Sequence, residues 1–220
     1  MNEALNFRAM QDQIVLAALP HVPFEGWSRR ALIEASKDAG FDPDAAQRAF
    51  PAGPVAAVEH LALLADQRLL DEAAAQDLSA LKVSERIAWL VRRRLEGWSG
   101  HREAIRRAVS LFGLPGHGAA ALRTTWHTVD AIWQAAGDKS TDFSYYSRRL
   151  TLAAVYSATT LCWLEDESEG FAETWLFLGR RLREVGQIPK IRANATRRIK
   201  ALPNPLYLLA KKKAGRARRF

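Results

Sequence analysis

Cysteine is almost absent from this 220-residue chain, which contains only Cys162. One thiol cannot form an internal disulfide or build a zinc site from thiolates. Such low cysteine usage is typical of a reducing compartment such as the cytoplasm. Cys162 lies between Leu161 and Trp163, an apolar setting that favours a small buried hydrophobe over a reactive thiolate.

Long hydrophobic runs are also missing. No stretch approaches the roughly 18–20 continuous apolar residues that a membrane-spanning helix needs. The opening segment MNEALNFRAMQDQIV has no basic region followed by an apolar core, so it does not resemble a secretory signal. We therefore expect a cytoplasmic chain that does not cross the membrane.

The motifs of common enzyme classes are absent as well. The sequence has no GxGxxG, no P-loop and no nucleophile elbow, and its five histidines lack the spacing of helical metal ligands. The acidic run EDESE at residues 165–169 precedes a predicted helix whose first turn favours acids. We interpret this run as a solvated loop, with a catalytic or metal role as the alternative. The sequence thus predicts no catalytic residue and no metal site.

Positive charge is plentiful but gathers at one end of the chain. The net charge is +8, and residues 180–220 hold 14 of the 32 Lys and Arg residues, with Glu184 as their one acid. That segment is therefore +13, and the rest of the chain is −5. Because DNA affinity rests largely on Lys and Arg that neutralise phosphates, the N-terminal part is poorly suited to bind DNA.

Almost every segment has apolar residues at helical spacing, and no segment shows the alternation of apolar and polar residues that is typical of a strand. We predict an all-α fold. Residues 147–164 are apolar around nearly the whole helix circumference, which predicts a central helix with neighbours on every side. The expected helices span about residues 4–18, 55–70, 84–98, 105–112, 119–136, 147–164 and 171–185.

Residues 27–50, WSRRALIEASKDAGFDPDAAQRAF, have the pattern of a helix-turn-helix, with Gly40 at the turn. Asp42 fits the cap of the second helix and Pro43 fits its first position. In a DNA reader the start of that helix enters the major groove. Here Asp42 and Asp44 would place carboxylates where phosphates lie. We predict that this motif keeps a packing role and has lost its DNA partner.

The stretch GWSRRALIEASKDAGFDPDAAQRAFPAGPVAAVEHL is similar to the N-terminal signature of TetR-type repressors. The resemblance implies a TetR-like fold, in which a larger helical bundle binds a ligand and dimerises. We expect a degenerate helix-turn-helix region over residues 1–52, a ligand-binding bundle over 53–188 and a basic tail over 189–220. A transcriptional regulator that senses a hydrophobic ligand is the alternative function.

The C-terminal tail combines apolar and basic residues, a pattern that suits the surface of an anionic membrane. Pro203 and Pro205 predict that an amphipathic helix ends near residue 202 and that a separate apolar anchor follows. A docked terminal helix with a solvated basic end, or nonspecific nucleic-acid contact, is the alternative. The predicted membrane-binding residues are Ile199, Leu202, Leu206, Tyr207, Leu208, Leu209, Lys211, Lys212 and Lys213.

Residues 129–185, VDAIWQAAGDKSTDFSYYSRRLTLAAVYSATTLCWLEDESEGFAETWLFLGRRLREV, strongly resemble the lipid-binding accessory proteins of ubiquinone (coenzyme Q) biosynthesis. The AGDxSTDF block, the aromatic pair after it, the AAVYSxT segment and the DES…TWxFLxRR segment carry the resemblance. It implies a noncatalytic protein, usually a homodimer, without a cofactor. Such a protein binds an isoprenoid or phospholipid ligand and presents a polyprenyl quinone intermediate to a hydroxylase of the demethoxyubiquinone type, on the inner face of the cytoplasmic membrane.

The resemblance places an enzyme-docking aromatic pair on Tyr145 and Tyr146. In the family the first of these positions is commonly Trp, so Tyr145 is a departure. We add Ile132 as a further partner-binding candidate. The apolar stripes predict a cavity that covers the lipid tail, at about 25 cal/mol per Å² of buried apolar surface. The predicted lipid-binding residues are Leu122, Trp126, Leu152, Tyr156, Leu161, Trp175 and Leu178.

Replacing Lys211, Lys212 and Lys213 together with Glu tests the basic tail. Each cation near an anionic surface contributes roughly 1 kcal/mol, so affinity for anionic liposomes should fall roughly a hundredfold or more. Liposome co-sedimentation measures the effect, and the triple Arg variant, which keeps the charge, should bind like the wild type. Equal binding by the Glu variant would remove the tail from the mechanism.

Overall fold

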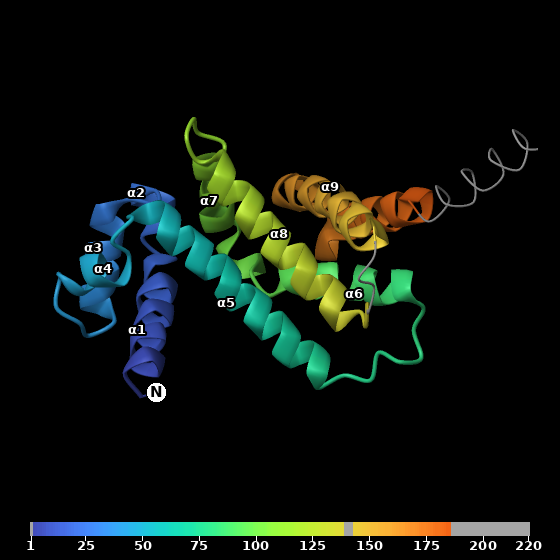
Figure 1. Cartoon of the computed structure of the whole chain (residues 1–220). Coiled ribbons are helices and arrows are strands. Elements are labelled where there is room, and N and C mark those ends of the chain that lie inside the picture. The colour runs from blue at the N-terminus through green and yellow to red at the C-terminus, as the bar shows by residue number, and fades with distance from the viewer. Residues whose placement is uncertain (1, 139–142, 186–220) are drawn as a thin grey trace, which may run out of the picture. The chain divides into compact units, whose positions relative to one another are not determined.

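The computed structural model describes residues 2–138 and 143–185 (Figure 1). Every regular element among them is helical, which confirms the predicted all-α class. One compact unit ends at Arg180, and a second unit begins at Arg181. The labelled α-helices are α1 Asn2–Ala18, α2 Val22–Glu25, α3 Arg29–Asp38, α4 Ala45–Ala49, α5 Pro54–Ala74, α6 Val83–Glu96, α7 Arg102–Phe112, α8 Gly118–Ala135 and α9 Phe143–Glu165. Short 3-10 turns span Ser99–His101 and Glu169–Phe171, and residues 172–185 are helical again.

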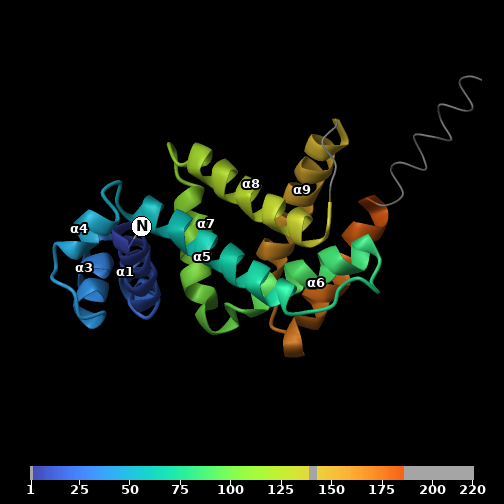
Figure 2. The same cartoon turned by 60° about the horizontal axis from the view of Figure 1, so that its bottom comes forward.

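The N-terminal helices form the predicted helix-turn-helix arrangement, in which α3 packs against both α1 and α4 (Figures 1 and 2). Ser28 caps α3, because its hydroxyl accepts a hydrogen bond from the Ala31 amide at 3.1 Å. Gly40 makes the turn in the left-handed region, at φ +80°. The second helix, α4, begins at Ala45 with Asp44 in the cap position, two residues after the predicted cap. The Asp42 carboxylate nevertheless accepts hydrogen bonds from the backbone amides of Asp44 and Ala45.

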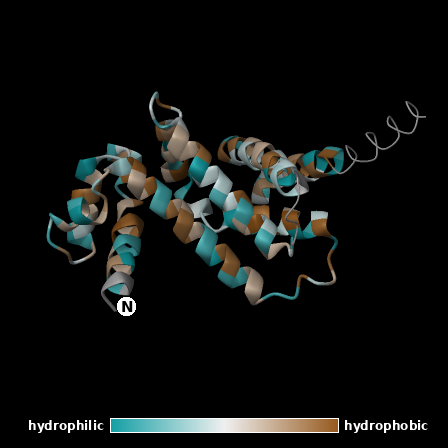
Figure 3. Ribbon diagram, in the orientation of Figure 1, coloured by the Kyte–Doolittle hydropathy of each residue, from teal (hydrophilic) through white to brown (hydrophobic). Residues whose placement is uncertain are grey.

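The larger bundle is built around α5 and α8, which lie side by side, with α6 and α9 packed beside them (Figures 1 and 2). Apolar and polar residues alternate along both α5 and α8 (Figure 3), as expected for helices with one buried face. Gly137 closes α8 at φ +84°, as predicted. Helix α6 begins at Val83 after Lys82, whose amide donates to Glu85, so the predicted start at Ser84 is one residue late.

Helix α9 is not surrounded on every side within the described residues, contrary to the prediction. Leu152 and Trp163 are buried, but Leu150 and Leu161 are more than half exposed. Apart from Ser147 and Arg148 near its start, the exposed residues of α9 repeat every three or four positions and so form one stripe along the helix. This stripe consists of Tyr146, Leu150, Ala154, Ser157, Leu161 and Glu165. Helix α9 is therefore apolar around most of its circumference but is buried on only part of it.

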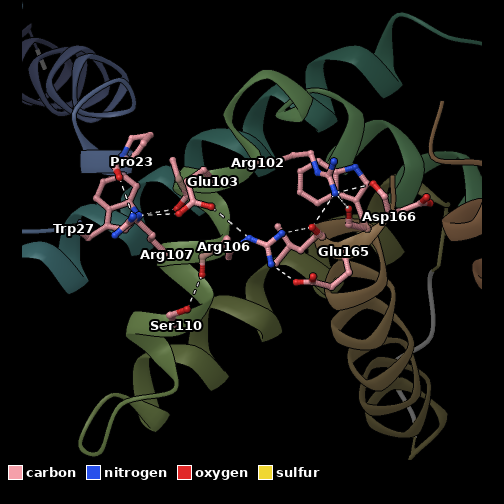
Figure 4. Close-up of polar contacts among 12 residues, drawn as sticks. Pro23, Trp27, Arg102, Glu103, Arg106, Arg107, Ser110, Glu165 and Asp166 are labelled. Carbon is pink, nitrogen blue, oxygen red and sulfur yellow. Dashed lines mark hydrogen bonds and ion pairs between the residues drawn. The ribbon is translucent and has the colours of Figure 1, made fainter. Parts of the chain in front are cut away.

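Helix α7 joins the N-terminal helices to the end of α9 through arginine side chains (Figure 4). On one side, Arg107 donates to the Pro23 carbonyl at 2.8 Å. On the other, Arg102 Nη2 donates to the carbonyls of Trp163 and Leu164 at 2.7 and 2.8 Å. The last carbonyls of a helix have no partner inside it and favour a nearby cation. Arg102 thus stabilises the C-terminal end of α9.

The acidic run after α9 is more structured than the predicted solvated loop. Asp166 is buried, and its two carboxylate oxygens accept hydrogen bonds from the amides and hydroxyls of Ser168 and Thr174. Glu165 pairs with Arg106 (Figure 4). Burial alone would raise the pKa of Asp166, but the hydrogen bonds from Ser168 and Thr174 outweigh it and hold the pKa well below its ordinary range.

This lowered pKa predicts acid sensitivity. A carboxyl whose pKa falls on folding stabilises the protein above its unfolded pKa of about 3.9, and that contribution disappears as the pH drops further. Asp166→Asn should lower the free energy of unfolding near neutral pH by about 1–3 kcal/mol. It should also flatten the loss of stability between about pH 5 and pH 2. Urea unfolding across pH measures both effects. The exposed neighbour Glu167, changed to Gln, is the control, and parallel curves for Asp166→Asn and wild type would contradict the assignment.

Candidate functional site: an apolar pocket with a polar inner end

A pocket of about 350 Å³ lies among five helices, α5 to α9. Its volume falls in the range of small-molecule sites, roughly 300–1,000 Å³. Apolar side chains form most of its wall, as is usual for such sites. The apolar lining residues are Val58, Leu61, Ala62, Ala65, Trp98, Ile105, Ala108, Val109, Phe112, Ala121 and Leu161.

The pocket has a buried end and an exposed end. The lining residues Leu61, Ala65 and Ala108 are buried, whereas Gly113 and Ser157 are exposed. The exposed pair stands at the end of α7 and on the outer stripe of α9. The exposed part of the lining thus lies on α7 and α9, and buried lining residues lie on α5 and α7.

A buried ion pair adjoins the pocket through Arg94, which forms part of the pocket wall. Arg94 on α6, which is 8% exposed, donates from Nε to Asp66 on α5 at 2.8 Å. Thr128 on α8 donates to the other oxygen of Asp66 at 3.0 Å, so three helices meet at one carboxylate. Burial lowers the pKa of Arg94, but the nearby Tyr156 and Asp66 outweigh burial and raise it, so the guanidinium keeps its charge.

Two of the seven predicted lipid-binding residues, Tyr156 and Leu161, line this pocket. The other five lie elsewhere. Leu152 and Leu178 are buried in the core, and Leu122 is 75% exposed on α8. Trp126 stacks on the ring of Tyr146, at 6.2 Å between centroids. Trp175 donates to the Gly170 carbonyl and lies against Arg92.

The aromatic pair predicted for partner binding lies at the start of α9. Tyr146 is 58% exposed, while the Tyr145 hydroxyl donates to Asp130 at 3.1 Å. This hydrogen bond and burial raise the pKa of Tyr145, and Arg149 lies over its ring at 3.4 Å from the centroid. Trp126, Tyr145 and Tyr146 form one aromatic cluster, in which Tyr146 is the exposed member. Ile132 does not share this surface, because its side chain is fully buried in the core.

The charged pocket residue Arg94 and its partner Asp66 were not anticipated, although the sequence carries a signal for this pair. Arg94 lies on the apolar stripe of α6 between Val91 and Trp98, and Asp66 lies beside Ala65 on the buried face of α5. A single charge on an apolar helix face, with an opposite charge on the apolar face of a neighbouring helix, indicates a buried pair.

Helix α4, at the position of the groove-reading helix in DNA-binding proteins, has its polar side chains already engaged. Arg48 on α4 donates both terminal nitrogens to Asp42, at 3.1 and 2.6 Å. Gln47 accepts a hydrogen bond from Arg29. Asp42 therefore pairs with the one cation of α4. The loss of a DNA-binding role stays a prediction.

The predicted membrane-binding residues, from Ile199 to Lys213, lie outside the described residues. Within residues 2–138 and 143–185, no helix has the length and apolar character to span a bilayer. The same residues contain no group of three His, Cys, Asp or Glu side chains placed to hold a metal ion.

Comparison with solved structures identifies the fold. The chain is similar to the crystal structure of a TetR transcriptional regulator from Nitrosomonas europaea ATCC 19718, with a TM-score of 0.65 and 25% sequence identity. The match covers 80% of this chain and 97% of that one. The protein is therefore an all-α protein of TetR-like fold, as predicted.

Comparison of sequences identifies the family. The chain is 34% identical to the mitochondrial ubiquinone biosynthesis protein COQ9 of Drosophila melanogaster, over 82% of this chain and 56% of the relative. It is 33% identical to the human protein of the same name, over 80% of this chain and 57% of that relative. Residues 118–189 match the COQ9 family model. The chain belongs to the COQ9 family. It spans somewhat more than half the length of these relatives.

Proposed function

We propose that this protein is a noncatalytic lipid-binding accessory protein of ubiquinone biosynthesis. It takes a polyprenyl quinone intermediate into the pocket between α5 and α9 and presents it to a membrane-associated hydroxylase. The observation that carries the proposal is the apolar pocket itself, which opens beside the exposed stripe of α9. Membership in a family whose curated members are named ubiquinone biosynthesis proteins supplies the pathway.

The physical need for such a protein follows from the ligand. A polyprenyl quinone is nearly insoluble in water, so its ring must reach an enzyme without leaving an apolar environment. Exposing the quinone to water costs free energy. Apolar walls such as Leu61, Val109 and Phe112 lower this cost by about 25 cal/mol per Å² of apolar surface removed from water. The proposed location is the surface of the membrane that holds the quinone, with the basic C-terminal tail as the anchor.

The alternative, a regulator that senses a hydrophobic ligand, uses the same pocket but requires DNA contact through α4. That helix has five residues and carries Arg48 as its one cation. Asp42 neutralises this charge, and Asp44 adds a second carboxylate at the helix start. Because DNA affinity depends on free cations facing phosphates, these contacts favour the lipid-handling function over the regulator.

The aromatic cluster of Trp126, Tyr145 and Tyr146 is the proposed docking site for the hydroxylase. Tyrosines and tryptophans are enriched among residues that dominate protein–protein affinity. Tyr145 is fixed by Asp130 and Arg149, which positions the exposed ring of Tyr146 at low cost in conformational entropy. We also propose that two copies of the chain form a homodimer, as the family resemblance implies.

Closing the pocket at its exposed end tests lipid binding. Ser157→Trp places a large ring at the mouth, and overpacking of about 1–3 kcal/mol should reduce bound lipid roughly tenfold. Mass spectrometry of lipid that copurifies with the native protein provides the measurement. Ala154→Trp is the matched control, because Ala154 lies on the same exposed stripe outside the lining. Equal lipid loss in both variants, or in neither, would exclude this pocket as the lipid site.

Changing Tyr146 to Lys tests the docking site. Its exposed ring can be replaced without opening the core, so affinity for the hydroxylase should fall roughly thirtyfold, a loss of about 2 kcal/mol. Pull-down and surface plasmon resonance with the purified hydroxylase measure this loss. Ile33→Lys, at an exposed apolar position on α3, is the control and should bind like the wild type. Unchanged binding by the Tyr146 variant would refute the docking assignment.

A further inference from the structure

Arg149, near the start of α9, is a charged residue that the fold buries almost completely, with 4% of its surface exposed. Its Nε donates to Asp130 on α8 at 2.6 Å, and its Nη1 donates to Asp138, just beyond the end of α8, at 3.2 Å. A buried charge is costly unless it is paired and hydrogen-bonded. The two carboxylates meet this requirement, and they join the start of α9 to α8.

The same guanidinium lies against the aromatic cluster of Trp126, Tyr145 and Tyr146. Its central carbon is 3.4 Å from the ring centroid of Tyr145, so the cation covers one face of that ring. The Asp130 oxygen that accepts a hydrogen bond from Arg149 also accepts one from the Tyr145 hydroxyl, at 3.1 Å. One ion pair therefore holds both the ring and the hydroxyl of Tyr145.

From Tyr145 the contacts continue to the protein surface. The rings of Tyr145 and Tyr146 meet edge to face, with 5.1 Å between their centroids. Tyr146, which is 58% exposed, also stacks on Trp126. The exposed ring of Tyr146 is thus supported by two neighbouring rings, and the ion pair of Arg149 with Asp130 holds one of them.

We propose that Arg149 is a positioning residue for docking of the partner enzyme. It holds Tyr145, and through Tyr145 it fixes the orientation in which the ring of Tyr146 meets that enzyme. Almost none of Arg149 is exposed, so it contributes little contact surface of its own. Fixing interface side chains before binding reduces the entropy that is lost when the complex forms. This inference rests on the docking role proposed above for the aromatic cluster.

The role depends on the shape of the arginine side chain as well as on its charge. A planar guanidinium donates to two carboxylates and covers an aromatic ring at the same time. An ammonium keeps the positive charge but has no planar face to place over the Tyr145 ring. Arg149→Lys therefore retains a cation beside Asp130 and Asp138 and releases Tyr145. A residue that served only to neutralise the carboxylates would tolerate this change without loss of docking.

A double-mutant cycle with Tyr146 tests the proposal. Surface plasmon resonance with the purified hydroxylase compares the wild-type chain, Arg149→Lys, Tyr146→Lys and the double variant, at a temperature where circular dichroism shows all four to be folded. Arg102→Lys is the matched control. Arg102 also lies over an aromatic ring, that of Phe171, and its guanidinium holds the opposite end of α9.

We expect Arg149→Lys to weaken docking about tenfold, and Arg102→Lys to bind like the wild type. The double variant should bind at most about twofold more weakly than Tyr146→Lys alone, because a positioning residue has no effect once the ring that it positions is gone. Losses that multiply in the double variant would overturn the inference, as would unchanged binding by Arg149→Lys or equal losses in Arg149→Lys and Arg102→Lys. Wild-type affinity of Tyr146→Lys would instead contradict the proposed docking site.

Asp130→Asn carries the test if Arg149→Lys does not fold. This change keeps the shape of a partly exposed side chain and removes the charge that pairs with Arg149. It should weaken docking about threefold or more in the wild-type background and leave the affinity of Tyr146→Lys unchanged. A loss of the same size in both backgrounds would show that the ion pair does not act through Tyr146, and the inference would fall.

Discussion

The ion pair between Arg94 and Asp66 joins the helices that surround the pocket. Asp66 accepts from Arg94 on α6 and from Thr128 on α8, so one carboxylate on α5 fixes the spacing of three helices. Removing one partner would leave a buried charge uncompensated, at a cost of about 3–5 kcal/mol, whereas apolar residues at both positions would cost little. Stability alone therefore does not explain the pair. The pair instead sets how α5, α6 and α8 are arranged beside the pocket wall that Arg94 lines.

Helix α7, which forms part of the pocket wall, is held in place by hydrogen bonds at both of its sides. Arg102 holds the last carbonyls of α9, while Arg107 and the Trp27 indole connect α7 to the N-terminal helices. The helix-turn-helix, which has its polar side chains engaged internally, thus supports one side of the helix that lines the pocket mouth. A motif that reads DNA in other proteins thus contributes packing contacts to the rest of the fold here.

Local sequence patterns were sufficient to predict the helices, because each records a short-range preference. Ser28, Gly40 and Gly137 mark turns and ends that the structure contains. The pocket lining was much less predictable. Leu122 and Leu161 have the same apolar character, yet Leu161 lines the pocket and Leu122 does not. Which apolar residues face a cavity depends on how helices cross, and no single helix pattern encodes that crossing. Arg94 was missed because it lies within a run of three arginines, two of which face solvent.

The pairing of Arg48 with Asp42 also affects how this end of the molecule responds to polyanions. Association with nucleic acid is driven by the release of ions condensed on its phosphates, and each free cation that replaces one contributes to the gain in entropy. A guanidinium matched by a neighbouring carboxylate brings no net charge to the duplex and displaces fewer of these ions. Contact between α4 and a duplex would thus gain less of this entropy than contact by a helix whose cations are free.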